Sequence, residues 1–224
     1  MTLQTGMMLL AAKMPLDMMI SKMSEGMVET LKIFFLTLLF SLPLGLVIAF
    51  GRMAKNRIIR YIVTVYIAIM RGTPLMLQVM AIYFGPNYLL HIRIPRSYRF
   101  IAIIVAFALN YAAYFAEIYR SGIESMPVGQ YEAARLLGYN KAQTFFKIIL
   151  PQVIKRILPS ITNEVICLVK DTSLMAYITA PEFLLVTKAY TSQTFLTIES
   201  YTILAVVYLI ICIPLAWGVK VLEK

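Results

Sequence analysis

Cysteine and histidine are scarce in this chain of 224 residues, which contains two cysteines and one histidine. Cys167 and Cys212 both fall inside apolar stretches, and neither has a second cysteine or a histidine at the spacing of metal ligands. A disulfide framework and a metal site are therefore not expected, and each thiol is interpreted as a small buried side chain. His91 stands in a basic loop without further ligand residues around it in the sequence.

Sequence motifs for catalysis are also missing. The chain contains no GxxxxGK[ST] phosphate loop, no HExxH and no GxSxG, so we do not expect an enzyme or a chain that binds ATP itself. Acidic residues are few, with 11 against 21 basic ones and a formal net charge of +10. We attribute that charge to basic loops beside anionic lipid and not to nucleic-acid binding.

Apolar residues are what the chain has in excess. They make up 60% of it, against about 45–50% in ordinary globular proteins, and the mean hydropathy is +0.78. The polar residues cluster between long apolar runs, a pattern that predicts an all-α integral membrane protein. A weakly patterned segment, 1–26, precedes a membrane domain, 27–224. The apolar positions of segment 1–26 favour a short helix that lies in the membrane interface. The five expected spans are Met27–Phe50, Ile58–Leu90, Phe100–Tyr119, Ile157–Thr179 and Thr197–Val221. The second span should break near Thr73 and Pro74. Between the fourth and fifth spans, Pro181–Ser192 is expected to be a loop or a short interfacial segment.

The basic residues indicate an orientation in the membrane. The loops after the first and third spans, together with the C-terminus, hold twelve of the 21 lysines and arginines, and the opposite side holds seven. By the positive-inside rule the N-terminus lies outside and the C-terminus in the cytoplasm. The basic loop 91–99 falls on the outer side and argues against this orientation.

One polar stretch, 129–159, interrupts the apolar runs. It is basic, rich in helix formers and too polar to enter a bilayer. Pro127 suits the first turn of a helix, Gly138 suits the left-handed residue that ends it, and Asn140 with Gln143 forms a capping-box variant. The stretch therefore predicts a helix, a tight turn and a second helix on the cytoplasmic side.

Residues of this stretch resemble the EAA loop of ABC-importer permeases. The matching positions are Glu132, Ala133, Ala134, Gly138, Ile148, Leu150 and Pro151. Flanking residues resemble the polar amino-acid branch of that family, namely Arg71–Pro74, Ala116–Glu117, Arg120–Ile123 and Lys170–Leu174. The alternative interpretation of 129–159 is an amphipathic connector between two membrane helices, without a docking role.

The resemblance implies a type I importer permease fold and a mode of action. A coupling loop of about 121–156 would dock on an ATPase through Glu132, Ala133, Ala134 and Gly138. Two ATPase subunits on separate chains would bind the ATP, so the permease itself needs no cofactor. The other implied partners are a second permease chain, in the simplest case an identical one, and an extracytoplasmic amino-acid-binding protein. The site of action would be the cytoplasmic membrane of a bacterium or archaeon, and the mechanism alternating access.

Charged and polar residues inside the expected spans are candidates for a translocation path, because burying them in lipid is costly. They form three helical stripes, which are Asn110, Tyr114 and Glu117; Glu164 with Lys170 and Asp171; and Arg71 with Gln78. The alternative is that Lys170–Asp171 and Glu117–Arg120 are ion pairs that fix helix packing.

The same residues suggest a substrate. Lys170 could bind the carboxylate of an amino acid, and Asp171, Glu164 or Glu117 its ammonium group. The surplus of acids favours basic amino acids such as arginine, lysine or histidine, with neutral ones such as glutamine as the alternative. Two other functions compete with amino-acid import. An ion-coupled carrier or channel leaves the EAA spacing unexplained, and a scaffold for an ATPase leaves the polar stripes unexplained.

Overall fold

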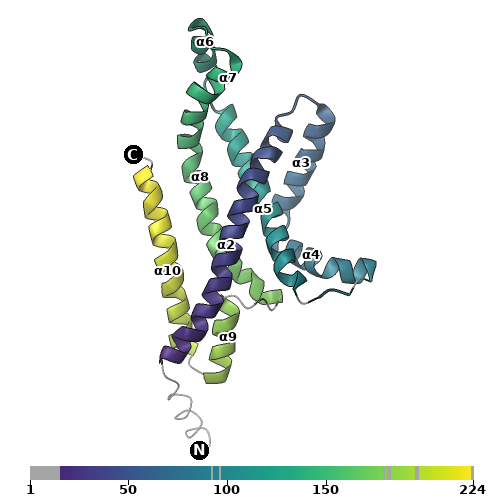
Figure 1. Ribbon diagram of the computed structural model, residues 1–224, viewed down its shortest axis with the longest axis vertical. Coiled ribbons are helices and arrows are strands. Elements are labelled where there is room, and N and C mark those ends of the chain that lie inside the picture. The colour runs from purple at the N-terminus through teal and green to yellow at the C-terminus, as the bar shows by residue number, and fades with distance from the viewer. Residues whose placement is uncertain are drawn as a thin grey trace, which may run out of the picture. The chain divides into compact units, whose positions relative to one another are not determined.

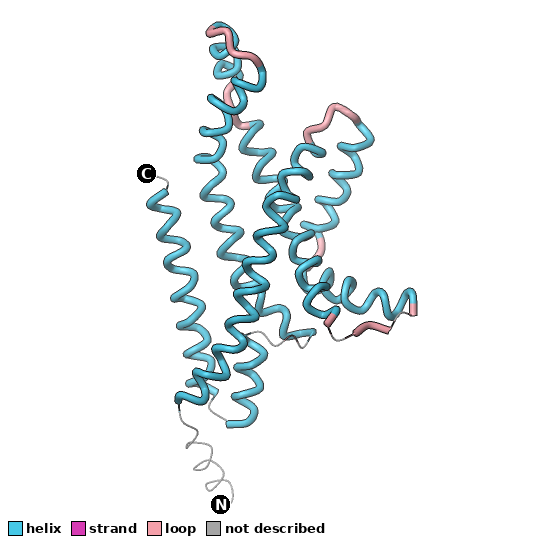
Figure 2. The backbone as a smooth tube through the Cα atoms, viewed as in Figure 1, coloured by secondary structure: helices cyan, strands magenta, loops and turns pink. Residues whose placement is uncertain are grey.

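The computed structural model describes residues 16–91, 93–95, 97–178, 180, 183–194 and 197–222. Every regular element in these ranges is helical, which confirms the all-α prediction (Figures 1 and 2). The α-helices are α2 Leu16–Arg52, α3 Arg57–Gly72, α4 Leu75–Leu90, α5 Tyr98–Glu124, α6 Val128–Leu136, α7 Lys141–Gln143, α8 Leu150–Asp171, α9 Phe183–Thr194 and α10 Thr197–Leu222. A π-helical segment, Thr144–Ile149, joins α7 to α8, and a 3-10 segment, Thr172–Ile178, follows α8.

Three of the described helices are long and apolar enough to cross a membrane. They are Met23–Arg52, Tyr98–Glu124 and Thr197–Gly218, and the pair α3 and α4 raises the number to four if it is counted as one broken span. The sequence predicted about five. The expected fourth span, which begins within α8, fails this test because any span-length stretch of α8 includes Lys155, Arg156 and Glu164.

The helix boundaries agree with the remaining spans and differ at two places. The second span breaks at Thr73 and Pro74 as expected, since proline lacks the N–H that would continue the helix. The expected interfacial helix runs without interruption from Leu16 into the first span, so the boundary at residue 26 stays a prediction, and residues 1–15 lie outside the described ones. The stretch 183–194, expected as a loop or short interfacial segment, is helix α9.

The chain divides into two compact units, of which the first comprises Met1–Thr37, Met76–Val105 and Ile166–Pro214. Its apolar core joins α2, α9 and α10 through Met23, Phe183, Tyr190 and Leu204. The buried hydroxyl of Thr30 on α2 accepts a hydrogen bond from the backbone N–H of Phe183, at 3.2 Å. Phe183 is the first residue of α9, so this contact satisfies one of the donors that every helix start leaves unpaired.

The second unit comprises Leu38–Leu75, Ala106–Val165 and Leu215–Lys224. Small residues let α2 and α5 approach closely here, as in many membrane helix pairs. A Cβ atom added to Gly45 would lie 2.8 Å from the Cβ of Phe115 and 3.1 Å from the carbonyl oxygen of Ala112. A core of Ala49, Ile67, Ala113 and Ala116 joins α2, α3 and α5 beside this crossing. The second unit also carries the polar stretch after α5.

Candidate functional site

Helix α6 forms the first half of the predicted coupling element. It begins after Pro127, whose backbone is extended and which is the N-cap instead of the first helical residue. Glu132 is therefore in the second turn of α6, where the N-terminal end of the helix dipole is weak, and its side chain is exposed. Ala133 is also exposed, whereas Ala134 is buried, with 1% of its surface accessible. Ala134 thus faces the interior of the coupling element, whereas Glu132 and Ala133 are accessible to a partner.

Gly138 ends α6 in the way that the sequence predicted. Its φ is +79°, in the left-handed region that other residues avoid. Two backbone hydrogen bonds close the turn, from the N–H of Tyr139 to the carbonyl of Ala134 and from the N–H of Gly138 to the carbonyl of Arg135, both at 3.0 Å. This pair of bonds is a Schellman motif, and it fixes the direction in which the chain leaves the helix.

The second half of the coupling element begins with a complete capping box, as expected. The side chain of Asn140 accepts from the N–H of Gln143 at 2.9 Å, and the side chain of Gln143 accepts from the N–H of Asn140 at 3.0 Å. The helix then widens into the π-helical segment, which ends at Ile149, two residues before Pro151. In a regular α-helix the ring of Pro151 would clash with the carbonyl of Lys147, and a wider turn makes room for it.

The two halves rest on a small apolar base. Met126, Ile149, Val153 and Ile157 are buried together there, and α6 and α7 lie at one end of α8 (Figure 1). Beyond the base, large apolar side chains point outward. Leu136 is 90% exposed, Leu137 74%, Val128 70% and Phe146 64%. Such a group of exposed apolar residues, rimmed by polar ones, is typical of a surface that binds another protein.

Three of the predicted path residues meet at the break in the second span. The amide nitrogen of Asn110 on α5 donates to the backbone carbonyl of Met70 at 3.0 Å, and the guanidinium of Arg71 lies 5.2 Å from the centre of the Tyr114 ring. The end of α3 leaves carbonyl groups without helical partners, and inside a membrane these must be satisfied by other groups. Asn110 therefore stabilises the end of α3 at the break, in addition to its other contacts.

Replacing Asn110 by leucine tests this role. Asn110 is 4% exposed, and the substitution would leave the Met70 carbonyl without this donor, so we expect the free energy of unfolding to fall by about 1–3 kcal/mol. The melting temperature of the detergent-purified protein measures the loss. Asn163 on α8 is exposed and serves as the matched control, since Asn163→Leu removes no hydrogen bond of this kind. Equal melting temperatures for the two variants would contradict the role of Asn110.

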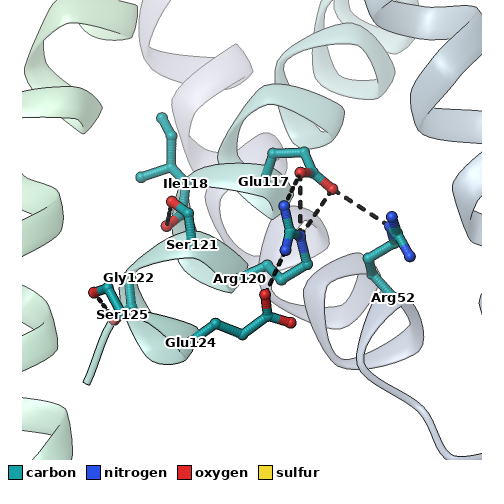
Figure 3. A network of polar contacts seen from close by, with 8 residues as sticks. All are labelled: Arg52, Glu117, Ile118, Arg120, Ser121, Gly122, Glu124 and Ser125. Carbon is teal, nitrogen blue, oxygen red and sulfur yellow. Dashed lines mark hydrogen bonds and ion pairs between the residues drawn. The ribbon is translucent and has the colours of Figure 1, made fainter. Parts of the chain in front are cut away.

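Glu117 lies in a network of ion pairs (Figure 3). Its carboxylate accepts from Nη2 of Arg120 at 2.6 Å and lies 3.5 Å from Nε of Arg52 at the end of α2. Arg120 also donates to Glu124. The predicted Glu117–Arg120 pair is present, whereas Arg52 was not anticipated, because it is 65 residues away in the sequence and only the packing of α2 on α5 brings it near.

The remaining predicted path residues fall on other elements. Glu164 is half-buried on α8, and Lys170 and Asp171 are the last residues of that helix. Gln78 is half-buried on α4. Gln78, Lys170 and Asp171 belong to the first unit, and the other predicted path residues to the second. A common path lined by all of them stays a prediction.

Comparison with known proteins identifies the family. Residues 41–224 match the family model described as the inner membrane component of binding-protein-dependent transport systems. The chain belongs to this family. A Bacillus subtilis relative, named as an amino-acid ABC transporter permease, is 39% identical over 89% of this chain and 87% of its own length. A Rickettsia conorii relative whose name assigns it to glutamine transport is 33% identical over 89% and 90%. One solved structure, of an amino acid ABC transporter with histidines, is 33% identical, with a TM-score of 0.82 over 91% of this chain and 93% of that one.

Family membership settles several expectations. The chain has the fold of an ABC-importer permease and is a multi-pass component of the inner membrane. It is a transport subunit and not an enzyme, it carries no cofactor of its own, and ATP is bound by the ATPase partner. Membership also implies ATPase subunits and a binding protein as partners.

Proposed function

We propose that this permease takes up polar amino acids, and that α6 and α7 are the surface on which its ATPase docks. The observation that carries the docking proposal is the geometry after α5, where a Schellman motif and a capping box hold two short helices at a fixed angle. Around that turn the exposed apolar residues include Leu136 and Leu137. The names of the two relatives and of the solved structure, which refer to amino acids, glutamine and histidines, support the substrate class.

The mechanism that fits these features is alternating access, driven by ATPase subunits on separate chains. Two ATPases that close on ATP push the coupling elements of two permease chains, and the spans reorient. The simplest assembly is a homodimer, since the described residues of one chain supply only three or four apolar spans to enclose a path. In this arrangement the N-terminus is extracytoplasmic, and the coupling element and the C-terminus are cytoplasmic, in agreement with the distribution of basic residues.

Within the polar amino acids, the geometry favours a neutral substrate such as glutamine. The argument for a basic substrate counted Glu117 as an acid available to a cation. Glu117 instead contacts both Arg52 and Arg120, so its charge is already balanced. Without Glu117 the surplus acid on which the preference for a basic amino acid rested is gone. Basic amino acids remain the second candidate, which the solved relative with histidines supports.

Competition uptake by cells that express the complete transport system tests the substrate. We expect uptake of labelled glutamine to be inhibited more strongly by unlabelled neutral polar amino acids than by arginine or lysine. Glu117→Gln should leave this order unchanged, because the residue binds arginines of its own chain. Stronger competition by arginine, lost in the Glu164→Gln protein, would establish the basic candidate instead. A system that takes up no amino acid at all would overturn the proposal.

A further inference from the structure

A small cavity between the end of α5 and the first half of α8 has three serines and one arginine among its lining residues. Its volume is about 250 Å³, and seven residues line it, of which one is basic and none is acidic. This is below the range of about 300–1,000 Å³ typical of pockets for drug-sized ligands, so the cavity suits a small group. The lining residues are Ile118, Ser121, Gly122, Ser125, Arg156, Ile157 and Ser160.

Arg156 is held in place at this cavity and has donors to spare. Its Nη1 donates to the backbone carbonyl of Ser125 at 2.7 Å and to the Ser125 hydroxyl at 2.9 Å. Its Nε and Nη2 groups make no hydrogen bond within the described part of the chain, and together they form the edge of a guanidinium that binds phosphate or carboxylate with two parallel bonds. A guanidinium already fixed on one side loses little freedom when it binds an anion on the other.

The serines divide into two kinds. The hydroxyl of Ser121 donates to the carbonyl of Ile118 at 3.1 Å, and that of Ser125 donates to the carbonyl of Gly122 at 2.8 Å (Figure 3). Both hydroxyl protons are therefore engaged with the backbone of α5. Ser160 lines the cavity and is exposed, and among the residues that the structure describes no such bond involves its hydroxyl. The donors that remain for a ligand are those of Arg156 and Ser160, which is a set for an anion.

The position of the cavity indicates where such an anion comes from. Ile118 and Ser121 lie near the end of the apolar span Tyr98–Glu124, and Ser125 directly follows it, next to the coupling element. If the coupling element is cytoplasmic, as the proposed function requires, this level is that of the lipid headgroups in the inner leaflet, whose surface is negatively charged. Ile118 and Ile157 offer apolar walls beside the polar groups.

We propose that this cavity binds the phosphate of an anionic phospholipid headgroup through Arg156 and Ser160. The bound lipid would link the end of α5 to the first half of α8 directly beneath the coupling element. The two acids that flank the lining residues along α5, Glu117 and Glu124, are both paired with Arg120, so their charges do not oppose the phosphate.

Native mass spectrometry of the delipidated full-length protein tests the proposal by counting bound lipids. The probes are phosphatidylglycerol, phosphatidylcholine and free inorganic phosphate. Wild-type protein should bind phosphatidylglycerol at least about tenfold more tightly than phosphatidylcholine, and Arg156→Gln should lower phosphatidylglycerol binding by about the same factor. Lys155 is the neighbouring exposed cation that does not line the cavity, and Lys155→Gln should change binding less than twofold.

A second variant keeps the test decisive if Arg156→Gln unfolds. Ser160→Leu fills the mouth of the cavity without touching the bonds between Arg156 and Ser125, and it should weaken phosphatidylglycerol binding to a similar extent. Equal effects of Lys155→Gln and Ser160→Leu would mean a general basic surface and overturn the proposal. Free phosphate that displaces the lipid at equal concentration would overturn the lipid assignment. Neither result depends on transport, so a failure here is distinct from a failure of the proposed function.

Discussion

A protein with Gly138 replaced by valine should insert its spans normally but fail to couple ATP hydrolysis to transport. Nothing lies within 4 Å of the position that the new Cβ would occupy, so the substitution causes no steric clash. The φ of +79° is the obstacle, since a β-branched residue in this region costs about 1–3 kcal/mol. The turn can avoid that cost by opening, and the angle between α6 and α7 would then change.

The measurement is ATPase activity of the purified complex with and without binding protein, together with uptake. Gly129 is a matched control, because it lies in the helical part of the same element and also has nothing within 4 Å of an added Cβ. We expect Gly129→Val to retain coupling and Gly138→Asn to retain most of it, since asparagine tolerates the left-handed region. Transport at the wild-type rate in the Gly138→Val protein would show that the turn does not transmit the motion.

The coupling element could be predicted in detail from the sequence because its structure is local. Gly138, Asn140 and Gln143 determine their turn through bonds that span only a few residues, so their order along the chain is sufficient. The break at Pro74 was predictable for the same reason. The position of Pro127 differs by a single residue, which is the usual uncertainty at a helix start, yet it moves Glu132 out of the first turn.

Side-chain partners from distant parts of the chain could not be predicted in this way. The polar residues of the spans were visible in the sequence, and their spacing placed Asn110, Tyr114 and Glu117 on one face of α5. That face meets the end of α3 through Met70 and Arg71, and the end of α2 through Arg52. The polar stripe is thus at least partly structural, a possibility that spacing alone cannot distinguish from a substrate path. The π-helical segment that leads into α8 is a further feature of this kind, since it depends on Pro151 and on the packing of the apolar base of the coupling element.

Replacing Glu117 by glutamine should produce a large loss of stability. The change keeps the shape of the side chain but removes the charge that lies between Arg52 and Arg120, whose side chains are only 28% and 26% exposed. Two guanidinium groups would then remain close together without their shared counter-charge. We expect the free energy of unfolding to fall by about 2–3 kcal/mol, since bonds between charged groups are lost and the partners stay partly desolvated.

Glu124 provides the control, because it binds the same Arg120 but its side chain is 53% exposed. An exposed ion pair contributes at most about 1 kcal/mol, so Glu124→Gln should lower the melting temperature of the purified protein much less than Glu117→Gln. The double variant Arg52→Gln/Glu117→Gln should lose less stability than the two single losses added together, because it also removes one of the opposed positive charges. Additive losses, or equal losses for the two glutamate variants, would mean that Glu117 does not hold the end of α2 against α5. The residue would then again be available to a substrate, and the case for a basic amino acid would be restored.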